Sequence, residues 1–299
     1  MNKRNVGFYI VDGIYLAMAI LPILFGIAVK VLFTPLSEGI AISGARIFFS
    51  LDMPIQPLIV TESQLNSLIV MITLLGICLY LTHGLSVRYP TRRQHLAEWL
   101  VEKSEKMTFS NMGEGFSGFP PLIAAILGLS ALSSLLSLFG LYPPTSDINV
   151  VSGWAITVFA LITYYKFKCG PVYYLKSFGD PVPLLAPLNI ISEIATPVSM
   201  AFRHYGNVLS GAVISVLVAT GLDGLWGIIM GWLPSPLSEM AFIRIGIPAV
   251  LSVYFDLFSG CLQAYIFAML AMLYISSGYP RDEHMKRKNK KQIKNKKTA

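Results

Sequence analysis

Long apolar runs dominate the pattern of residues along this chain, and short polar stretches separate them. A run of about twenty apolar residues is long enough to cross the ~30 Å hydrocarbon core of a bilayer as an α-helix. We expect six membrane-crossing helices, over about residues 8–33, 65–83, 120–141, 150–165, 184–222 and 240–277. The sequence therefore predicts an all-α multi-pass membrane protein with about six transmembrane segments.

The last two runs are much longer than one bilayer crossing requires, at about 38 residues each. A straight helix of that length would measure roughly 57 Å, which is nearly twice the thickness of the apolar slab. We expect these two helices to be strongly tilted, bent or broken. Pro187 and Pro197 are the expected places for bends in the first of the pair.

The segments between the runs carry most of the polar and turn-forming residues. Residues 34–62 contain three prolines and are expected to form an outer loop. After the second run, the stretch His95–Val101 has the spacing of a short amphipathic helix that lies at the inner surface. We expect this helix to end at Gly113, Gly115 and Gly118. A loop that begins near Asp223 is expected to join the last two runs.

Composition supports the membrane class, since 54% of the residues are hydrophobic and only 13% are charged. These values leave no room for a sizeable soluble domain. The net charge of +7 is concentrated in residues 281–299, and the rest of the chain is neutral. A basic tail directly after a membrane span indicates cytoplasmic retention or contact with anionic lipid, so we expect no nucleic-acid partner.

The basic residues also predict the orientation of the chain. Six crossings with both termini in the cytoplasm place nearly all Lys and Arg residues on the inner side, as the positive-inside rule requires. Only three basic residues fall on the outer side, Lys30, Arg46 and Arg244. The three cysteines have no paired spacing, so neither a disulfide framework nor a metal or cofactor site is expected.

Arg203 lies near the middle of the fifth run, about nineteen residues from either end. A guanidinium stays protonated at any workable pH, so this is a permanent positive charge at membrane depth. At 1.5 Å per residue it lies roughly 28 Å along the helix from each end, too far to reach the bilayer surface. The charge must therefore face water or a protein partner.

Other polar residues share one helical face with this arginine. In the fifth run they recur at steps of three or four, as do those of the last run, and small residues that would allow another helix to approach lie nearby. A soluble amphipathic helix would show the same spacing. In segments of membrane length, however, we expect the polar faces to point toward a cavity or toward each other. The two faces comprise Asn189, Glu193, Thr196, Met200, Arg203, Asn207 and Ser210, and Ser252, Asp256, Ser259 and Gln263.

The residue types on these faces suit ion transfer. Arg203 cannot relay a proton but can hold a neighbouring carboxylate in its ionised form, whereas burial allows Asp256 to exchange one near working pH. Asn207 and Gln263 can orient a guanidinium or water without titrating. Such a set is incomplete within one chain, because the arginine lacks a partner carboxylate. We therefore expect another subunit to supply it.

Two further residues are weaker candidates for the ion path. His204 can titrate near neutrality, but it lies about 100° around the helix from Arg203. Glu193 can lie on the inner part of the path, and a capping role or simple surface exposure explains it equally well.

At these residues the chain resembles the a subunits of the F-type, or rotary, ATP synthase, from about Glu62 onward. The resemblance is strongest over Ser199–Val208 and then over Asp256–Tyr274, which contains the run Gln263-Ala264-Tyr265. The resemblance also covers two segments nearer the N-terminus, Arg93–Glu98 and Thr145–Asn149. The resemblance divides the chain into an N-terminal span and outer loop (1–62), a subunit a membrane domain (63–280) and a basic cytoplasmic tail (281–299).

The resemblance implies that Arg203 is the essential arginine that faces the ring of c subunits, with Asn207 and Gln263 as its polar neighbours. Asp256 falls where the family places a Glu or His that lines the outer half-channel. The chain departs from the family at His204, where Leu is usual, and at Ala212, where Glu or His is frequent. The two long helices would form a tilted hairpin against the c ring.

The implied function is that of an ion-translocating stator subunit, with the proton as the expected ion, in a bacterial plasma membrane. Its implied partners are the c ring, the b subunit of the stator, other ATP synthase subunits and membrane lipid. The chain has no phosphate-binding Gly-Lys-Ser/Thr loop, so we expect no catalysis by this subunit itself. The alternative is a self-contained secondary transporter or channel, which would predict inverted repeats and a complete site within one chain.

Overall fold

The computed structural model describes residues 6–33, 44–54, 57–88, 90–179, 183–230, 250 and 253–279. Its α-helices are α1 (Val6–Phe33), α2 (Glu62–Thr82), α3 (Arg92–Met112), α4 (Pro120–Leu135), α5 (Ile148–Cys169), α6 (Pro171–Ser177), α7 (Ala186–Met230) and α10 (Gly260–Ser277). A π-helix, Tyr254–Ser259, directly precedes α10. Short 3-10 turns occupy Glu114–Phe116, Leu136–Phe139, Pro144–Ser146 and Pro183–Leu185.

Within the described ranges, six helical segments are long and apolar enough to cross a membrane: Val6–Leu32, Glu62–Thr82, Pro120–Phe139, Ile148–Lys168, Pro183–Ile228 and Leu257–Ser277. The predicted class of all-α multi-pass membrane protein is therefore confirmed. The predicted basic tail at 281–299 lies outside the described residues. So do the turn between the two long helices and the start of the last one.

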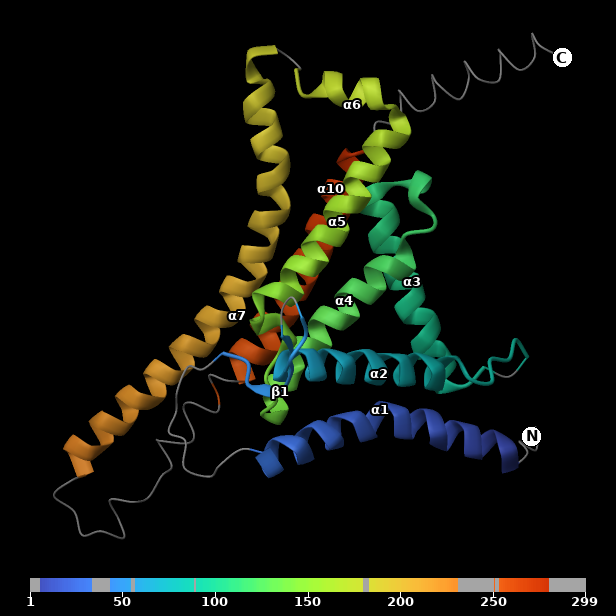
Figure 1. The fold of residues 1–299 in the computed structure, drawn as a ribbon. Coiled ribbons are helices and arrows are strands. Elements are labelled where there is room, and N and C mark those ends of the chain that lie inside the picture. Colours follow the sequence, from blue (N-terminus) through green and yellow to red (C-terminus); the bar gives the residue numbers. More distant parts are fainter. Residues whose placement is uncertain are drawn as a thin grey trace.

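The helices form two groups in space (Figure 1). Helices α1 and α2 lie side by side, and α4, α5 and α10 pack together beside α3. Helix α7 packs on α5 and runs steeply across the direction of α1 and α2. If the single-crossing helices α1 and α2 stand upright in a bilayer, α7 is therefore strongly oblique.

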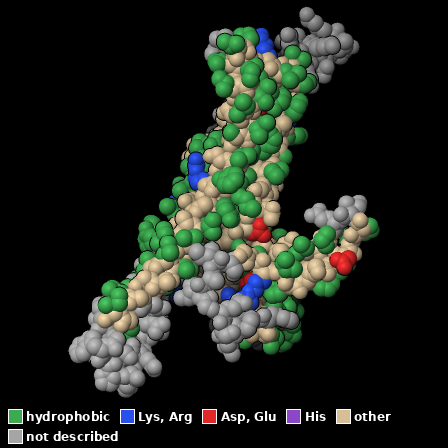
Figure 2. All heavy atoms as spheres, turned by 60° about the vertical axis from the view of Figure 1, so that its left-hand side comes forward, with side chains coloured by type: hydrophobic (Ala, Val, Ile, Leu, Met, Phe, Trp, Pro, Cys, Tyr) green, Lys and Arg blue, Asp and Glu red, His purple; other side chains and the backbone are tan. Residues whose placement is uncertain are grey.

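The main buried core lies where α3, α4, α5, α7 and α10 meet. Ile123 of α4, Phe267 and Met272 of α10 are almost completely inaccessible to solvent there, and Val158 of α5 and Met200 of α7 pack with them. Many apolar side chains outside this core are exposed. In Figure 2, apolar side chains are spread over the elongated part of the molecule, and few charged side chains lie among them. This surface suits a lipid environment, where burial inside the chain is not needed to shield apolar groups.

Local sequence explains where α5 begins and ends. The Asp147 carboxylate accepts a hydrogen bond from the Asn149 amide at 2.9 Å, as an N-cap side chain does. At the other end Gly170 has φ 121°, a conformation that disfavours side chains, and its amide donates to the Phe167 carbonyl. Pro171 then begins α6, because its missing N–H costs nothing at the first helical position.

One sequence prediction about element bounds was wrong, and two others were incomplete. The predicted outer loop at 34–62 contains an antiparallel hairpin of β1 (Ile47–Leu51) and β2 (Leu58–Thr61). The predicted amphipathic helix at His95–Val101 is part of the longer α3, which ends at Met112, directly before Gly113 as expected. Helix α7 does not end near Leu222 but continues through Asp223 to Met230. One polar residue in a long apolar helix was mistaken for the start of a loop.

Helix α7 and the π-helix also modify the predicted faces. Pro197 lies inside α7, which continues on both sides of it and changes direction along its length (Figure 1). The six-residue π-helix has a wider turn than an α-helix, so it rotates the positions before it relative to those after it. Ser252 lies outside the described residues, and from Asp256 to Gln263 the predicted face is not one straight α-helical stripe.

Helices α1 and α2 approach closely at Gly76. A Cβ atom on this glycine would lie 2.6 Å from the backbone nitrogen of Ala19 and 2.8 Å from the carbonyl carbon of Met18. Both of those atoms belong to backbone and cannot rotate away. Only glycine therefore permits this spacing of the two helices.

We expect Gly76→Ala to force α1 away from α2 and to lower the free energy of unfolding by about 1–3 kcal/mol, as overpacking does. Thermal unfolding of the detergent-solubilised protein measures the change. Gly153→Ala in α5 is the control, because its Cβ would meet no atom within 4 Å. Equal unfolding midpoints for the two variants would contradict the proposed close contact.

Candidate functional site

The side chain of Arg203 lies on the molecular surface and not in the core of the chain. Arg203 and its neighbour Phe202 are exposed on α7, whereas Met200 and Ala201 are buried. Within the part of the chain that the structure describes, the Arg203 guanidinium has no hydrogen-bond or ion-pair partner. The charge is thus directed away from this chain, where a group from outside can approach it.

One turn after Arg203, a hydrogen bond joins α7 to α10. The Asn207 amide donates from Nδ2 to Oε1 of Gln263 over 2.5 Å, and Gln263 is buried. The sequence prediction that these two polar faces meet is therefore confirmed at this pair. The pair lines a cavity of about 20 Å³, together with three serines of neighbouring elements, Ser134, Ser137 and Ser259. A cavity of this volume has room for about one water molecule.

Small residues allow the helices to come together around this cavity. Gly260 packs on Ser134, so that a Cβ on the glycine would lie 2.6 Å from Ser134 Cβ. Gly211 faces Phe255 of the π-helix, and Ala264 is completely buried. Asp256 lies in the same π-helix, a rare element that is frequent at functional sites. The Asp256 side chain lies outside the described residues, and its role stays a prediction.

His204 points into the core rather than toward the exposed face of Arg203. Its side chain is completely buried, and Nε2 lies 3.4 Å from the Ser130 hydroxyl. The rings of Trp154 and Phe267 pack on the imidazole with their centroids 6.1 and 5.3 Å away. Among the described residues, Nδ1 has no hydrogen-bond partner. The structure thus separates His204 from the polar face, and its predicted part in the ion path remains untested.

Glu193 lies in a polar cluster near the end of α5. Its Oε1 accepts hydrogen bonds from Lys166 Nζ at 2.9 Å and from the Tyr174 hydroxyl at 3.2 Å. Burial raises the pKa of Tyr174, and the negative charge of Glu193 raises it further. The cluster borders a cavity of about 230 Å³, whose polar lining includes Lys166, Asn189, Ser192, Glu193, Thr196 and Ser277. Capping is therefore not the role of Glu193 here.

Sequence reasoning missed Lys166 and Tyr174 as parts of this cluster. Lys166 was counted only among the basic residues of the inner side, and 27 positions separate it from Glu193. No helical spacing links residues so far apart, and α6, which carries Tyr174, was not predicted.

A larger polar cavity lies at the opposite end of α5. It measures about 280 Å³, and its charged lining residues are Lys30, Arg46 and Glu62. Ser137 and Pro143 belong to the walls of this cavity and also to those of the small cavity at Asn207. Sequence reasoning missed this site, although Lys30 and Arg46 had appeared as exceptions to the inner location of basic residues.

Comparisons with known proteins agree with the sequence resemblance. The family described as "ATP synthase A chain" matches residues 64–276. "ATP synthase subunit a 1" of Crocosphaera subtropica is 32% identical over 214 residues, which cover 71% of this chain and 83% of the relative. "ATP synthase subunit a" of Bacillus pumilus is 31% identical over 235 residues, covering 72% and 92%. The protein of the same name from Alkalihalophilus pseudofirmus is 33% identical over 223 residues, covering 70% and 85%.

The buried His204 generates a prediction about stability. We expect His204→Leu to change the free energy of unfolding by no more than about 1 kcal/mol, because it removes the unpartnered Nδ1 and only a long contact from Nε2 to Ser130. His204→Ala, which leaves a cavity among aromatic rings, should instead lower it by about 2–5 kcal/mol. Thermal unfolding of both variants measures the difference. A loss of stability in His204→Leu as large as that in His204→Ala would contradict this interpretation.

Proposed function

Because the chain belongs to the ATP synthase A chain family, we propose that it is the ion-translocating stator subunit of the F-type ATP synthase membrane sector. The observation that carries the proposal is the exposed charge of Arg203 on the long helix α7. No acid among the described residues neutralises it. A rotor subunit that brings a carboxylate past this position would supply the missing partner.

The chemistry of such an encounter explains why an ion crosses the membrane only when the rotor turns. A carboxylate that has taken up a proton is neutral and can move through lipid at low cost. When it reaches Arg203, the fixed positive charge favours its ionised form, so the proton is released. The same charge repels a proton that would pass directly across the membrane. Each charge moved across the membrane is worth about 2.3 kcal/mol per 100 mV, which can drive rotation.

Polar cavities at both ends of α5 support two separate access routes. The cavity at Glu193 and Lys166 suits the inner half-channel, and the cavity at Lys30, Arg46 and Glu62 suits the outer one. Each has charged side chains in its lining and room for several water molecules, which can conduct protons. Arg203 lies on α7 between Glu193 and Asn207, where the two routes must stay apart.

The remaining predicted residues take distinct roles in this proposal. The Asn207–Gln263 pair holds α7 against α10 and orients water beside Arg203. Asp256 exchanges the ion in the outer half-channel. His204 acts in the core by packing on Trp154 and Phe267, rather than by transferring protons. We accordingly expect His204→Leu to pump normally.

The chain is a component of the ATP synthase complex and a multi-pass membrane protein. We propose that it contacts the c ring through the face of Arg203, binds the b subunit of the stator, and catalyses no step of ATP synthesis itself. We further propose a bacterial plasma membrane with both termini in the cytoplasm. The distribution of basic residues supports this orientation.

We expect Arg203→Ala to reduce ATP-driven proton pumping by about a hundredfold, because a fixed charge at the transfer site is lost. Assembly with the c ring should survive. Proton uptake by inverted membrane vesicles measures pumping, and co-purification measures assembly. Lys103→Ala is the matched control, since Lys103 is an exposed basic residue on α3. Pumping near the wild-type rate in Arg203→Ala would refute the proposed ion path.

The coupling ion can be identified in the same vesicles. We expect ATP synthesis to proceed without added Na⁺ and to stop when a protonophore collapses the proton gradient. Synthesis that depends on Na⁺ and resists the protonophore would assign the path to Na⁺ instead.

A further inference from the structure

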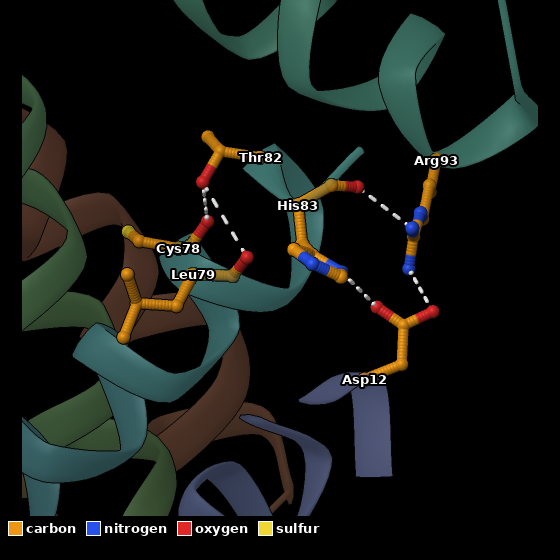
Figure 3. Close-up of polar contacts among 6 residues, drawn as sticks. All are labelled: Asp12, Cys78, Leu79, Thr82, His83 and Arg93. Atoms are coloured by element: carbon orange, nitrogen blue, oxygen red, sulfur yellow. Dashed lines mark hydrogen bonds and ion pairs between the residues drawn. The ribbon is translucent and has the colours of Figure 1, made fainter. Parts of the chain in front are cut away.

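The N-terminal segment lies before residue 64, where the family match begins, and yet it is firmly attached to the membrane domain. Figure 3 shows Asp12 of α1 between His83, which follows α2, and Arg93 of α3. The Asp12 carboxylate lies 2.8 Å from His83 Nδ1 and accepts a hydrogen bond from Arg93 Nη1 at 2.8 Å. Arg93 Nη2 also donates to the His83 carbonyl at 2.7 Å. One carboxylate thus fixes α1 to two elements of the family domain, which is the part of the chain that the family match covers, residues 64–276.

The other end of α1 is attached as well. Lys30 Nζ donates a hydrogen bond to the carbonyl of Gly140, in the connection between α4 and α5. The hairpin that follows is joined to α2, because the Glu62 amide donates to the Arg46 carbonyl at 2.8 Å and Ile47 pairs with Thr61. Both ends of α1 and the hairpin are therefore held against the family domain.

These attachments build most of the charged wall of the outer cavity. Its three charged lining residues, Lys30, Arg46 and Glu62, all precede the family match. The cavity volume of about 280 Å³ gives room for several water molecules. The cavity therefore has both the polarity and the space to hold water.

The outer cavity also adjoins the small cavity at the Asn207–Gln263 pair. It shares the walls Ser137 and Pro143 with the small cavity that Asn207 and Gln263 line. Asn207 follows Arg203 by one helical turn. The two adjoining cavities thus extend from Lys30 to the turn of α7 that follows Arg203.

We propose that the N-terminal segment forms the outer vestibule of the ion path, through which protons and water reach the Asn207–Gln263 pair. This inference rests on the proposed function, since it assigns an entrance to that ion path. Lys30 and Arg46 are positioning residues in it: Lys30 fixes the wall at Gly140, and the backbone of Arg46 fixes the hairpin at Glu62. Hydrated protons from the outer medium enter the ion path through this vestibule.

Gly44→Cys tests the vestibule with little disturbance, because Gly44 lines the cavity and a Cβ there meets no atom within 4 Å. The variant is made in a chain whose own cysteines are replaced by serine, and the whole complex is assembled in membranes. A membrane-impermeant, cationic thiosulfonate reagent is then added from the outer side. We expect proton conduction to fall about tenfold on labelling, because the added charge and bulk keep protons out of the vestibule.

Asp52→Cys is the matched control, since Asp52 is exposed at the end of β1 in the same hairpin and does not line the cavity. It should be labelled from the same side without loss of conduction. Complete labelling of Gly44→Cys with unchanged conduction would overturn the inference, and so would labelling only from the inner side. If Arg203→Ala still abolishes pumping in that case, the proposed function survives and only the vestibule fails.

Discussion

The structure depends on one electrostatic constraint: a guanidinium in a membrane-spanning helix must find water or an opposite charge. Among the described residues, Arg203 finds no such charge within its own chain, and its position on α7 is exposed. In the proposed function, the cavities at the two ends of α5 supply water, and a neighbouring subunit brings an acid to the exposed face. A charge that would destabilise a lone helix would then become useful in the assembly.

The surrounding packing serves to hold that charge in place. Met200, Ala201 and His204 of α7 are buried against the other helices, which orients Arg203 outward. The bond from Asn207 to Gln263 fixes the next turn to α10. His204 shows how a titratable residue beside the proposed functional arginine can serve packing, because its ring packs against those of Trp154 and Phe267.

Sequence reasoning could predict the features that depend on local periodicity. Apolar length gave the six spans, and steps of three and four residues brought Asn207 and Gln263 into one site. It could not predict the partner of Glu193, because Lys166 meets it only through the packing of α5 on α7. The β-hairpin was also missed, since its two strands are short and apolar and resemble the loops beside membrane spans. That Glu62, the first residue of α2, lines the outer cavity could be seen only from the structure of that hairpin.

The π-helix at Tyr254–Ser259 has a consequence for how this chain compares with its relatives. A turn of this kind holds roughly one residue more than an α-helical turn, and that residue rotates everything upstream by about 100° relative to α10. An aligned chain that lacks the surplus residue would present a different side chain at the position of Asp256. Equivalent chemistry in two relatives can therefore stand at alignment columns that differ by one place, even where the three-dimensional site is the same.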